Sequence, residues 1–374
     1  MRILVVGMAD SVHLSRWLSQ FHGSNHVFRV VSSSPHRRIH SQLNLLFSSD
    51  RYSISRISKF LSLPMWLADR FLSDWIRGLL IAFEARRFKP DLVHVLEFQN
   101  GGYAYLRARA VSSTLKKTPL LLTPYGSDIY WYQNYPSHLA RIRKLLTSAA
   151  AISSECRRDE VLATKYGFEG RFMPRVPAFG AIEIHEPASG RCNRKQIAVK
   201  GYQNTWGQAI LALKALEIAS SRLNGHEVVL YSCNKATIKA ARGFAARTGL
   251  KVTVHPKGAL SNQEVLEIFQ SSALYIGLST SDGISASMIE AMANGAIPIQ
   301  SDTSCCDEWL ADEVGGYLVR FDDVEKVAEL VARIIEDESW QRQAAQKNFE
   351  TLKDKLDPEK TKQAAFQTYE LLSI

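Results

Sequence analysis

Short apolar runs alternate along the chain with longer segments whose apolar positions recur at three- and four-residue steps. The short runs have the length and the Val, Ile and Leu content of buried strands, whereas the longer segments are typical of helices that bury one face. Strands that alternate with helices predict parallel sheets joined by right-handed crossovers. We expect strands at Ile3–Val6, His26–Val31, Leu92–Val95, Leu120–Thr123, Ala149–Ser153, Gln196–Val199, Glu227–Ser232, Val252–His255, Leu274–Leu278, Ile297–Gln300 and Gly316–Val319.

The strand rhythm stops once, at residues 174–195, where Pro and Gly residues crowd together, and it restarts at Gln196. A chain of 374 residues is long enough for two domains at roughly 100–200 residues each. We therefore expect one Rossmann-like domain over residues 1–178 and a second over residues 195–355.

Both ends of the chain also carry a structural prediction. The apolar run Met1–Gly7 is short, includes an Arg and soon meets Asp10, so it indicates a first buried strand rather than an export signal. The segment Glu338–Leu372 is helical with an interruption near Pro358. We expect its last part, residues 356–374, to be a helix that crosses back to the N-terminal domain.

Charge divides the chain into unlike halves. Residues 1–180 contain 25 Lys and Arg against 12 Asp and Glu, a net charge of +13, whereas residues 181–374 contain 21 against 25, a net charge of −4. A basic half indicates an anionic partner such as a phosphorylated substrate or a lipid surface, although a merely solvated basic surface is an open alternative. Within it, Arg51–Arg87 mixes Arg and Lys with Trp66, Phe71 and Trp75 at helical spacing from Met65 onward. This pattern fits an interfacial helix on an anionic membrane and ordinary core packing equally well.

Five cysteines are present, and no two have C-x-x-C spacing. An odd count without that spacing favours neither a disulfide framework nor a zinc site, so we expect a reduced, cytoplasmic setting. No apolar stretch approaches the roughly 18 residues that a membrane-spanning helix needs. Any membrane attachment is therefore expected to be peripheral, on the inner face.

The segment after the predicted strand Leu274–Leu278 is the most informative one for chemistry. Its Ser-rich turn contains Asp282 and leads into a helix that Ser285 or Ser287 can cap. Ligands of parallel sheets bind beyond the carboxyl ends of the strands, and the free N–H groups of a helix start suit a diphosphate. Glu290 lies about two turns into this helix. Many α/β proteins bind nothing at such a turn, so the pattern alone leaves that reading open.

This segment resembles the E-x7-E element of retaining glycosyltransferases of the GT-B fold, especially glycosyltransferase family 4. The chain reads Asp282-x7-Glu290 and then Ala-Met-Ala-x-Gly295, with Asp in place of the first Glu. Further segments are similar to family motifs in the same order along the chain. They are Lys89-Pro-Asp-Leu-Val-His94, Thr123-Pro-Tyr125-Gly-Ser-Asp128, Val176-Pro177 and His255-Pro-Lys257-Gly-Ala-Leu-Ser261-x-x-Glu264. The resemblance implies an α/β protein of two Rossmann-like domains facing across a cleft.

The resemblance also implies roles for single residues. Glu290 is expected to bind the nucleotide ribose, Asp282 the sugar hydroxyls, and the backbone around Gly283, Ile284, Ser285, Ala286 and Ser287 the phosphates. The family's Arg and Lys are missing, because the chain reads Val199-Lys200-Gly201 and Trp206-Gly207 at those positions. Lys200 or Lys257 is expected to supply the cation instead. Acceptor-side candidates are Asp10, Ser11, His13, Tyr125 and Asp128, with His13 as the first choice; a helix-start His that caps or packs is an equal alternative.

The co-substrate would therefore be a nucleotide-diphosphate sugar, with UDP as the expected nucleotide, and no separate cofactor is expected. We expect a hexosyltransferase that retains the anomeric configuration and needs no metal, since the sequence contains no D-x-D triplet. The acceptor would be a lipid-linked glycan of bacterial surface polysaccharide or glycoconjugate synthesis, and nucleic acid is not expected as a partner. Two alternatives stay open: a GT-B enzyme that does not transfer sugar, such as a sugar-nucleotide epimerase, and an inactive sugar- or nucleotide-binding protein. A Rossmann dehydrogenase is disfavoured because G-x-G-x-x-G is missing after the first strand.

Overall fold

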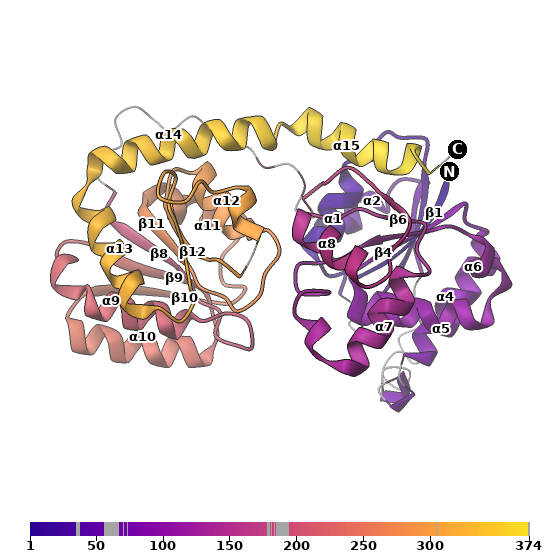
Figure 1. Cartoon of the computed structure of the whole chain (residues 1–374), viewed down its shortest axis with the longest axis horizontal. Coiled ribbons are helices and arrows are strands. Elements are labelled where there is room, and N and C mark those ends of the chain that lie inside the picture. Colours follow the sequence, from indigo (N-terminus) through magenta and orange to yellow (C-terminus); the bar gives the residue numbers. More distant parts are fainter. Residues whose placement is uncertain are drawn as a thin grey trace. The chain divides into compact units, whose positions relative to one another are not determined.

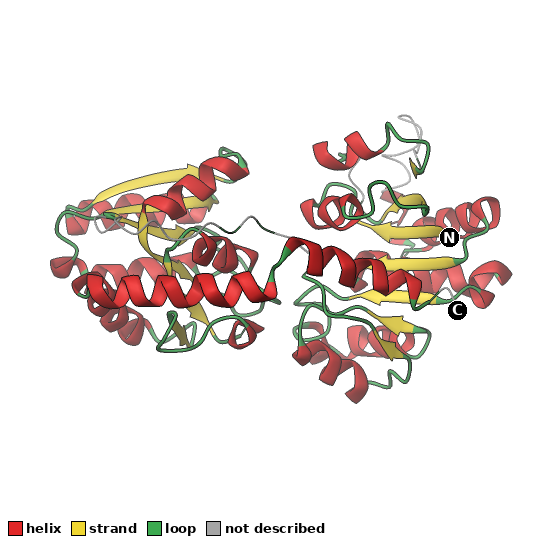
Figure 2. Cartoon of the chain, turned by 90° about the horizontal axis from the view of Figure 1, so that it is seen from above, coloured by secondary structure: helices red, strands yellow, loops and turns green. Residues whose placement is uncertain are grey.

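A computed structural model describes residues 1–34, 38–55, 67–69, 71–72, 74–177, 180, 182, 184, 194–303 and 305–372. The chain divides into two compact units (Figure 1). Unit 1 comprises Met1–Ala181 and Pro358–Ile374, and unit 2 comprises Ile182–Asp357. In each unit the strands lie between helices (Figure 2).

Unit 1 is built on a seven-stranded sheet whose strands all pair in parallel, in the order β3-β2-β1-β4-β5-β6-β7. The buried positions of β1 are apolar, and those of β4 are apolar except for His94, because helices cover both faces of a parallel sheet. The elements are β1 (Arg2–Gly7), α1 (Val12–Ser19), β2 (Val27–Ser32), α2 (Ser41–Leu46), β3 (Tyr52–Ile54), α4 (Trp75–Phe88), β4 (Leu92–Leu96), η1 (Phe98–Gly102), α5 (Tyr103–Val111), α6 (Ser113–Lys117), β5 (Leu120–Thr123), η2 (Tyr132–Asn134), α7 (Pro136–Leu146), β6 (Ala151–Ile152), α8 (Arg157–Lys165), β7 (Arg171–Phe172) and α15 (Pro358–Glu370).

Unit 2 repeats the same logic with a six-stranded parallel sheet in the order β10-β9-β8-β11-β12-β13. Its elements are β8 (Gln196–Lys200), α9 (Ala209–Ile218), η3 (Ser220–Arg222), β9 (Glu227–Cys233), α10 (Lys235–Thr248), β10 (Lys251–Pro256), α11 (Asn262–Ser271), β11 (Ser272–Gly277), α12 (Ala286–Ala293), β12 (Ile297–Ser301), η4 (Cys305–Glu308), β13 (Tyr317–Val319), α13 (Val324–Glu336) and α14 (Glu338–Lys355). Local signals fix several ends: Ser261 and Glu264 form a capping box at the start of α11, and Gly249 ends α10 in the left-handed conformation.

The order of the strands reverses direction at one point in each sheet. In unit 1 this point lies between β1 and β4, and in unit 2 between β8 and β11. Open parallel sheets bind ligands outside the carboxyl ends of the strands at such a switch point. Ligand-binding sites are therefore expected at the carboxyl ends of these four strands.

The α/β prediction is confirmed, and each of the 11 expected strands overlaps an observed strand. β3 and β7 were not predicted. The expectation of one amphipathic helix from Met65 onward is wrong for the described residues, because Asp74 takes a left-handed φ of 71° and α4 starts only at Trp75. Residues 56–66, 70 and 73, which include Trp66, lie outside the described residues.

Helix α15 packs into unit 1 through a buried chain of hydrogen bonds. Trp17 Nε1 donates to the Tyr369 hydroxyl at 2.9 Å, and that hydroxyl lies 2.8 Å from His94 Nδ1. His94 Nε2 lies 2.7 Å from Thr123 Oγ1. All four residues are buried, so the chain fixes α15 against α1, β4 and β5 by polar contacts as well as apolar ones.

Candidate functional site

The candidate site of unit 2 lies at the carboxyl ends of β8 and β11, the switch point of its sheet. Lys200 is the last residue of β8, and Asp282 lies in the loop that follows β11. Lys200 Nζ and Asp282 Oδ2 are 3.8 Å apart. Burial by itself lowers the pKa of Lys200, but the Asp282 carboxylate reverses this and the net pKa lies above the usual range. The two residues that sequence reasoning assigned to the donor therefore form one ion pair, with Lys200 fully charged.

Helix α12 starts beside this pair. Ser285 is its N-cap, and the Ser285 side chain accepts from Met288 N at 3.4 Å. The first-turn amides of Ala286 and Ser287 are not used by this cap, and the helix dipole adds partial positive charge here. The Gly283 amide is already engaged, because it donates to Asp282 Oδ1 at 2.9 Å. The Gly283 amide, one of the backbone groups that we expected to bind phosphates, thus donates within the turn instead.

Glu290 lies in the second turn of α12 and is 8% exposed. Its negative charge raises the pKa of Tyr231, although burial is the largest cause of that rise. Tyr275 is completely buried, and burial raises the pKa of its hydroxyl against the opposing charge of Lys200. Both phenols therefore stay protonated, and their buried hydroxyls can donate to a ligand. Sequence reasoning missed these tyrosines because each one occupies a strand position that also suits a core residue.

A second loop closes the site from the side of β8. Thr280 N donates to the Trp206 carbonyl at 2.8 Å, and Gly207 forms an antiparallel bridge with Ser279. A Cβ at Gly207 would meet Tyr202 at 2.6 Å, so glycine is required at this position. The loop therefore follows the β11–α12 turn closely at the place where the resemblance leads one to look for a Lys.

The Tyr202 ring joins the two predicted cations. Lys200 Nζ lies 5.7 Å from its centroid and Lys257 Nζ lies 5.6 Å from it. Both ammonium groups thus approach one aromatic ring at cation–π distance. Gly201 is tightly surrounded, and a Cβ at this position would overlap the Cys233 sulfur and the Tyr231 carbonyl. Tyr202 was not predicted, and the signal that could have found it is its position directly after Lys200-Gly201.

In unit 1 the acceptor-side candidates gather at the corresponding switch point. Ser11 caps α1 by accepting from His13 N at 3.1 Å. The His13 and Tyr125 rings lie 5.7 Å apart, although Tyr125 follows β5 and His13 follows β1. Asp10 precedes the cap and is partly buried. Burial and the nearby Glu97 raise the pKa of Tyr125 well above its usual value, so its hydroxyl stays protonated.

Asp128 has a structural position rather than an open one. Its Oδ2 accepts from Phe98 N and from Tyr125 N, both at 2.8 Å, and the residue is 6% exposed. Burial and the charge of Glu97 raise the pKa of Asp128 well above its usual value. Glu97 is itself buried with a φ of 71° and caps the π-helical turn η1 through the amides of Asn100 and Gly101. We expected Asp128 on the acceptor, whereas its carboxylate braces the turn that carries Tyr125.

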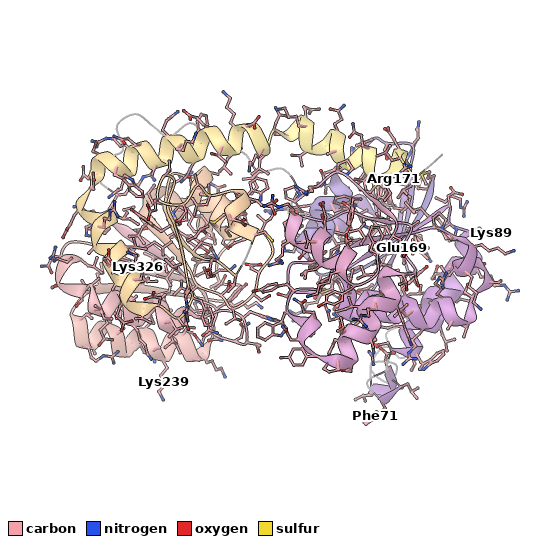
Figure 3. All side chains as sticks on the ribbon, in the orientation of Figure 1. Phe71, Lys89, Glu169, Arg171, Lys239 and Lys326 are labelled. Carbon is pink, nitrogen blue, oxygen red and sulfur yellow. The ribbon has the colours of Figure 1, made fainter. Side chains whose placement is uncertain are left out.

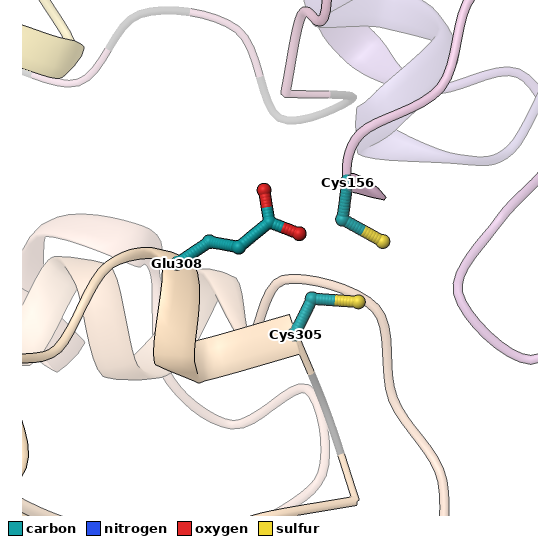
Figure 4. Close-up of side chains that lie close together, drawn as sticks. All are labelled: Cys156, Cys305 and Glu308. Atoms are coloured by element: carbon teal, nitrogen blue, oxygen red, sulfur yellow. The ribbon is translucent and has the colours of Figure 1, made fainter. Parts of the chain in front are cut away.

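Three side chains of a metal-ligating type, two of them cysteines, come from the two different units. Cys305 and Glu308 lie on the short helix η4 of unit 2, whereas Cys156 caps α8 of unit 1 (Figure 4). The four cysteines that the structure describes are buried, and none of them forms a disulfide. Two ligand atoms from one unit do not complete a four-ligand site, so this grouping carries no metal assignment.

Comparisons with known proteins agree with this architecture. Residues 2–155 match the family described as glycosyl transferase 4-like, and residues 208–351 match the family glycosyl transferases group 1. Among curated proteins no sequence match is found.

Solved structures share the fold at low sequence identity. HepE from Anabaena in complex with UDP is 15% identical, with a TM-score of 0.72 over 100% of both chains. Sucrose-phosphate synthase from Thermosynechococcus elongatus is 14% identical, with a TM-score of 0.71 over 100% of this chain and 99% of that one. S. aureus TarM, in a mutant structure with UDP, is 12% identical; the match has a TM-score of 0.62 and covers 77% of this chain and 58% of TarM.

Two parallel α/β units with these matches define the GT-B class. The chain is a GT-B glycosyltransferase that resembles glycosyltransferase family 4.

Proposed function

We propose that the chain is a retaining glycosyltransferase that moves a sugar from a nucleotide-diphosphate sugar, with UDP as the nucleotide, to a glycan acceptor. The observation that carries this proposal is the meeting of Lys200, Asp282 and the start of α12 at one switch point. A diphosphate needs a fixed cation and backbone donors, and this place offers both. The structures of HepE and TarM, which hold UDP, support the choice of nucleotide.

Each group at the site then has one task. Lys200 and the amides of Ala286 and Ser287 bind the diphosphate, Asp282 binds hydroxyls of the sugar, and Glu290 binds the ribose. Without donor, Asp282 holds the Lys200 ammonium at 3.8 Å. A diphosphate that takes over Lys200 loosens the hold of this ammonium on Asp282 Oδ2, while Asp282 Oδ1 accepts from Gly283 N and keeps the turn in shape.

Retention follows if the acceptor hydroxyl attacks from the face that the leaving diphosphate vacates. The C1–O bond to the diphosphate breaks, the acceptor oxygen bonds to C1, and the departing phosphate oxygen takes the hydroxyl proton. Catalysis comes from orientation and from stabilising the charge on the leaving group, which the Lys200 ammonium and the helix start provide. A metal ion has no task in this scheme, because these groups already neutralise the diphosphate.

A lipid-linked acceptor and peripheral membrane binding complete the proposal, in bacterial surface glycan synthesis on the cytoplasmic face. Helix α4 exposes Leu79 (54%) and Phe83 (59%), and it ends in exposed Arg86 and Arg87. Neither Arg has an ion-pair partner among the residues that the structure describes. Phe71, just before α4, is 82% exposed (Figure 3). Exposed apolar groups next to free cations suit an anionic membrane surface.

Attachment of this kind is peripheral. In the described part of the chain, no helix combines the length and the apolar character that crossing a bilayer requires. Attraction of a few Arg residues to anionic lipid contributes about 1 kcal/mol each and weakens as salt rises.

The donor half of the proposal is tested first by thermal shift with a panel of nucleotide sugars, because a bound donor raises the melting temperature. Sugar transfer is then measured for Glu290→Ala and Asp282→Ala, both of which we expect to lose activity while remaining folded. Glu267→Ala, an exposed acid on α11, is the matched control and should keep activity. Full activity in both site variants would refute the site. Donor consumed without any acceptor product would instead favour the epimerase alternative.

The membrane half is tested by co-sedimentation with vesicles of phosphatidylcholine and phosphatidylglycerol at low salt. The double variant Phe83→Asp, Arg86→Glu should lose binding. Val161→Asp, Lys165→Glu makes the same changes on α8, where Val161 is 60% exposed, and should keep it. Wild-type protein that ignores the vesicles, or equal losses in both variants, would overturn this half alone.

A further inference from the structure

Four aromatic residues stand close together on the loop that leads from Asp128 to helix α7. They are Tyr130, Trp131, Tyr132 and Tyr135, and we call them the aromatic platform. Tyr135 is 45% exposed, and the other three are partly exposed. Rings left in solvent on one short loop are unusual, because large aromatic groups stabilise a protein mainly when they are buried. Tyr132 packs against the core of unit 1, whereas Trp131 and Tyr135 are not among the residues of that core.

The platform belongs to the ligand edge of the sheet. Its loop follows β5 directly, and Trp131 N donates to the Ser127 carbonyl at 3.1 Å. Tyr125, near the start of this loop, lies against the His13 ring at the same edge. Ile129, which directly precedes the platform, is buried. The platform thus continues the acceptor-side candidates without a break in the chain.

The rings are held in place before any ligand arrives. Tyr132 packs on His138 with 4.6 Å between ring centroids, and the Arg158 guanidinium covers the Tyr130 ring at 4.3 Å. Pro136 fixes the start of α7 directly after Tyr135. Trp131 and Tyr135 are left as the outer pair, with centroids 6.5 Å apart and planes inclined by 47°. Rigid rings of this kind bind with little loss of conformational entropy.

The available polar atoms point to a hydroxylated ligand. Trp131 Nε1 and the hydroxyls of Tyr132 and Tyr135 make no hydrogen bond to any other residue that the structure describes. An indole N–H and two phenols beside flat apolar faces match a pyranose ring, which has an apolar C–H face and a rim of hydroxyls. A fatty-acyl chain would leave these polar groups unused.

Local charge separates a neutral sugar from an anionic surface. Arg158, next to the platform, pairs with buried Asp159 at 3.0 Å, and Arg141 on α7 pairs with Asp74 at 3.4 Å. An anion would have to compete with these carboxylates. The exposed Arg86 and Arg87 lie instead on α4, which is a different helix.

We infer that the aromatic platform binds one or more pyranose rings of the acceptor glycan, with Trp131 and Tyr135 as the stacking faces. This inference rests on the proposed transferase function, since it names the part of the acceptor that unit 1 recognises. It assigns the sugar portion of the acceptor to the platform, whereas the proposed lipid contact lies on α4.

The test compares Trp131→Ala and Trp131→Phe in the full-length chain. Binding of maltoheptaose, a soluble pyranose oligosaccharide, is measured by calorimetry without donor, and UDP binding is measured separately. We expect Trp131→Ala to weaken saccharide binding about tenfold or more, as truncated aromatic anchors do. Trp131→Phe should retain most of it, and both variants should bind UDP like the wild type. Phe172→Ala on β7 is the exposed aromatic control, with saccharide binding unchanged.

The outcomes separate this inference from the proposed function. Saccharide affinity that is equal in Trp131→Ala and wild type overturns the platform, and so does a wild-type protein that binds neither maltoheptaose nor its β-linked counterpart cellohexaose. If Trp131→Ala instead abolishes binding to phosphatidylglycerol vesicles and leaves saccharide binding intact, the platform is a lipid anchor and the inference is wrong. A wild-type protein that does not bind UDP refutes the donor proposal. The saccharide measurement still tests whether the platform binds sugar.

Discussion

The hydroxyl of Tyr369 holds the last helix of the chain in unit 1, and its removal gives a sharp prediction. Tyr369→Phe keeps the ring but deletes the partner of Trp17 Nε1 and of His94 Nδ1. Trp17 and His94 are 1% and 0% exposed, so water does not replace the lost hydroxyl. A buried polar group without a partner destabilises by about 1–3 kcal/mol. With two such groups we expect a loss of about 2–6 kcal/mol in the free energy of unfolding of unit 1.

Urea unfolding followed by tryptophan fluorescence and far-UV circular dichroism measures this loss. Tyr166→Phe is the matched control, because its hydroxyl makes a single hydrogen bond, to Gln133 Oε1 at 2.7 Å, at a partly exposed site. The control should lose less than about 1 kcal/mol. A Tyr369→Phe variant as stable as this control would refute the buried chain of hydrogen bonds.

The same chain predicts how stability depends on pH. Burial lowers the pKa of His94 to about 3, from 6.5 in an unfolded chain. Between these values the unfolded state binds a proton that the folded state excludes, so stability falls as the pH falls below 6.5. The loss is up to about 1.4 kcal/mol per pH unit, or about 2 kcal/mol between pH 6.5 and pH 5. His94→Gln should remove this contribution to the pH dependence of stability. If the free energies of unfolding of variant and wild type differ by the same amount at pH 7 and at pH 5, the pKa of His94 is not lowered by folding and the reasoning is wrong.

Two further predictions concern the donor site. Lys200→Met should raise the dissociation constant for UDP by one to two powers of ten, since a charge-assisted contact contributes about 1.5–3 kcal/mol; Lys195→Met, an exposed Lys before β8, is the calorimetric control and should change it little. Glu290→Ala should weaken binding of bare UDP, whereas Asp282→Ala should leave it nearly unchanged because Asp282 serves the sugar; equal effects of the two changes would contradict the division of roles.

The fold could be predicted from the sequence because parallel strands buried on both faces leave a clear record of short apolar runs. β3 and β7 left no such record, as they are three and two residues long. Asp74 broke the expected helix through a backbone conformation that apolar spacing does not reveal. The spacing of apolar residues predicts which face of a helix is buried, but it does not predict a single residue whose backbone conformation ends the helix.

The candidate site divides in the same way. The separation of Lys200, Asp282 and α12 along the chain does not show that they meet, but their places after β8 and β11 do, once the order of strands is known. Tyr275 could not be found, because a tyrosine in a strand also reads as core. Asp128 was expected to face the acceptor, and only its two backbone donors reveal that its carboxylate is needed to shape a turn.

Total charge and local charge favour different units for an anionic ligand, and the local arrangement decides. The N-terminal half carries +13 and the C-terminal half −4, so bulk charge would assign a diphosphate to unit 1. Charges act over about 8–10 Å in physiological salt, however, and the switch point of unit 1 presents Glu97 and Asp128, two buried carboxyl groups rather than cations. The switch point of unit 2 presents Lys200, Lys257 and a helix start. This local arrangement supports our proposal that the diphosphate binds in unit 2, and the proposal leaves the basic excess of unit 1 for surfaces such as the end of α4.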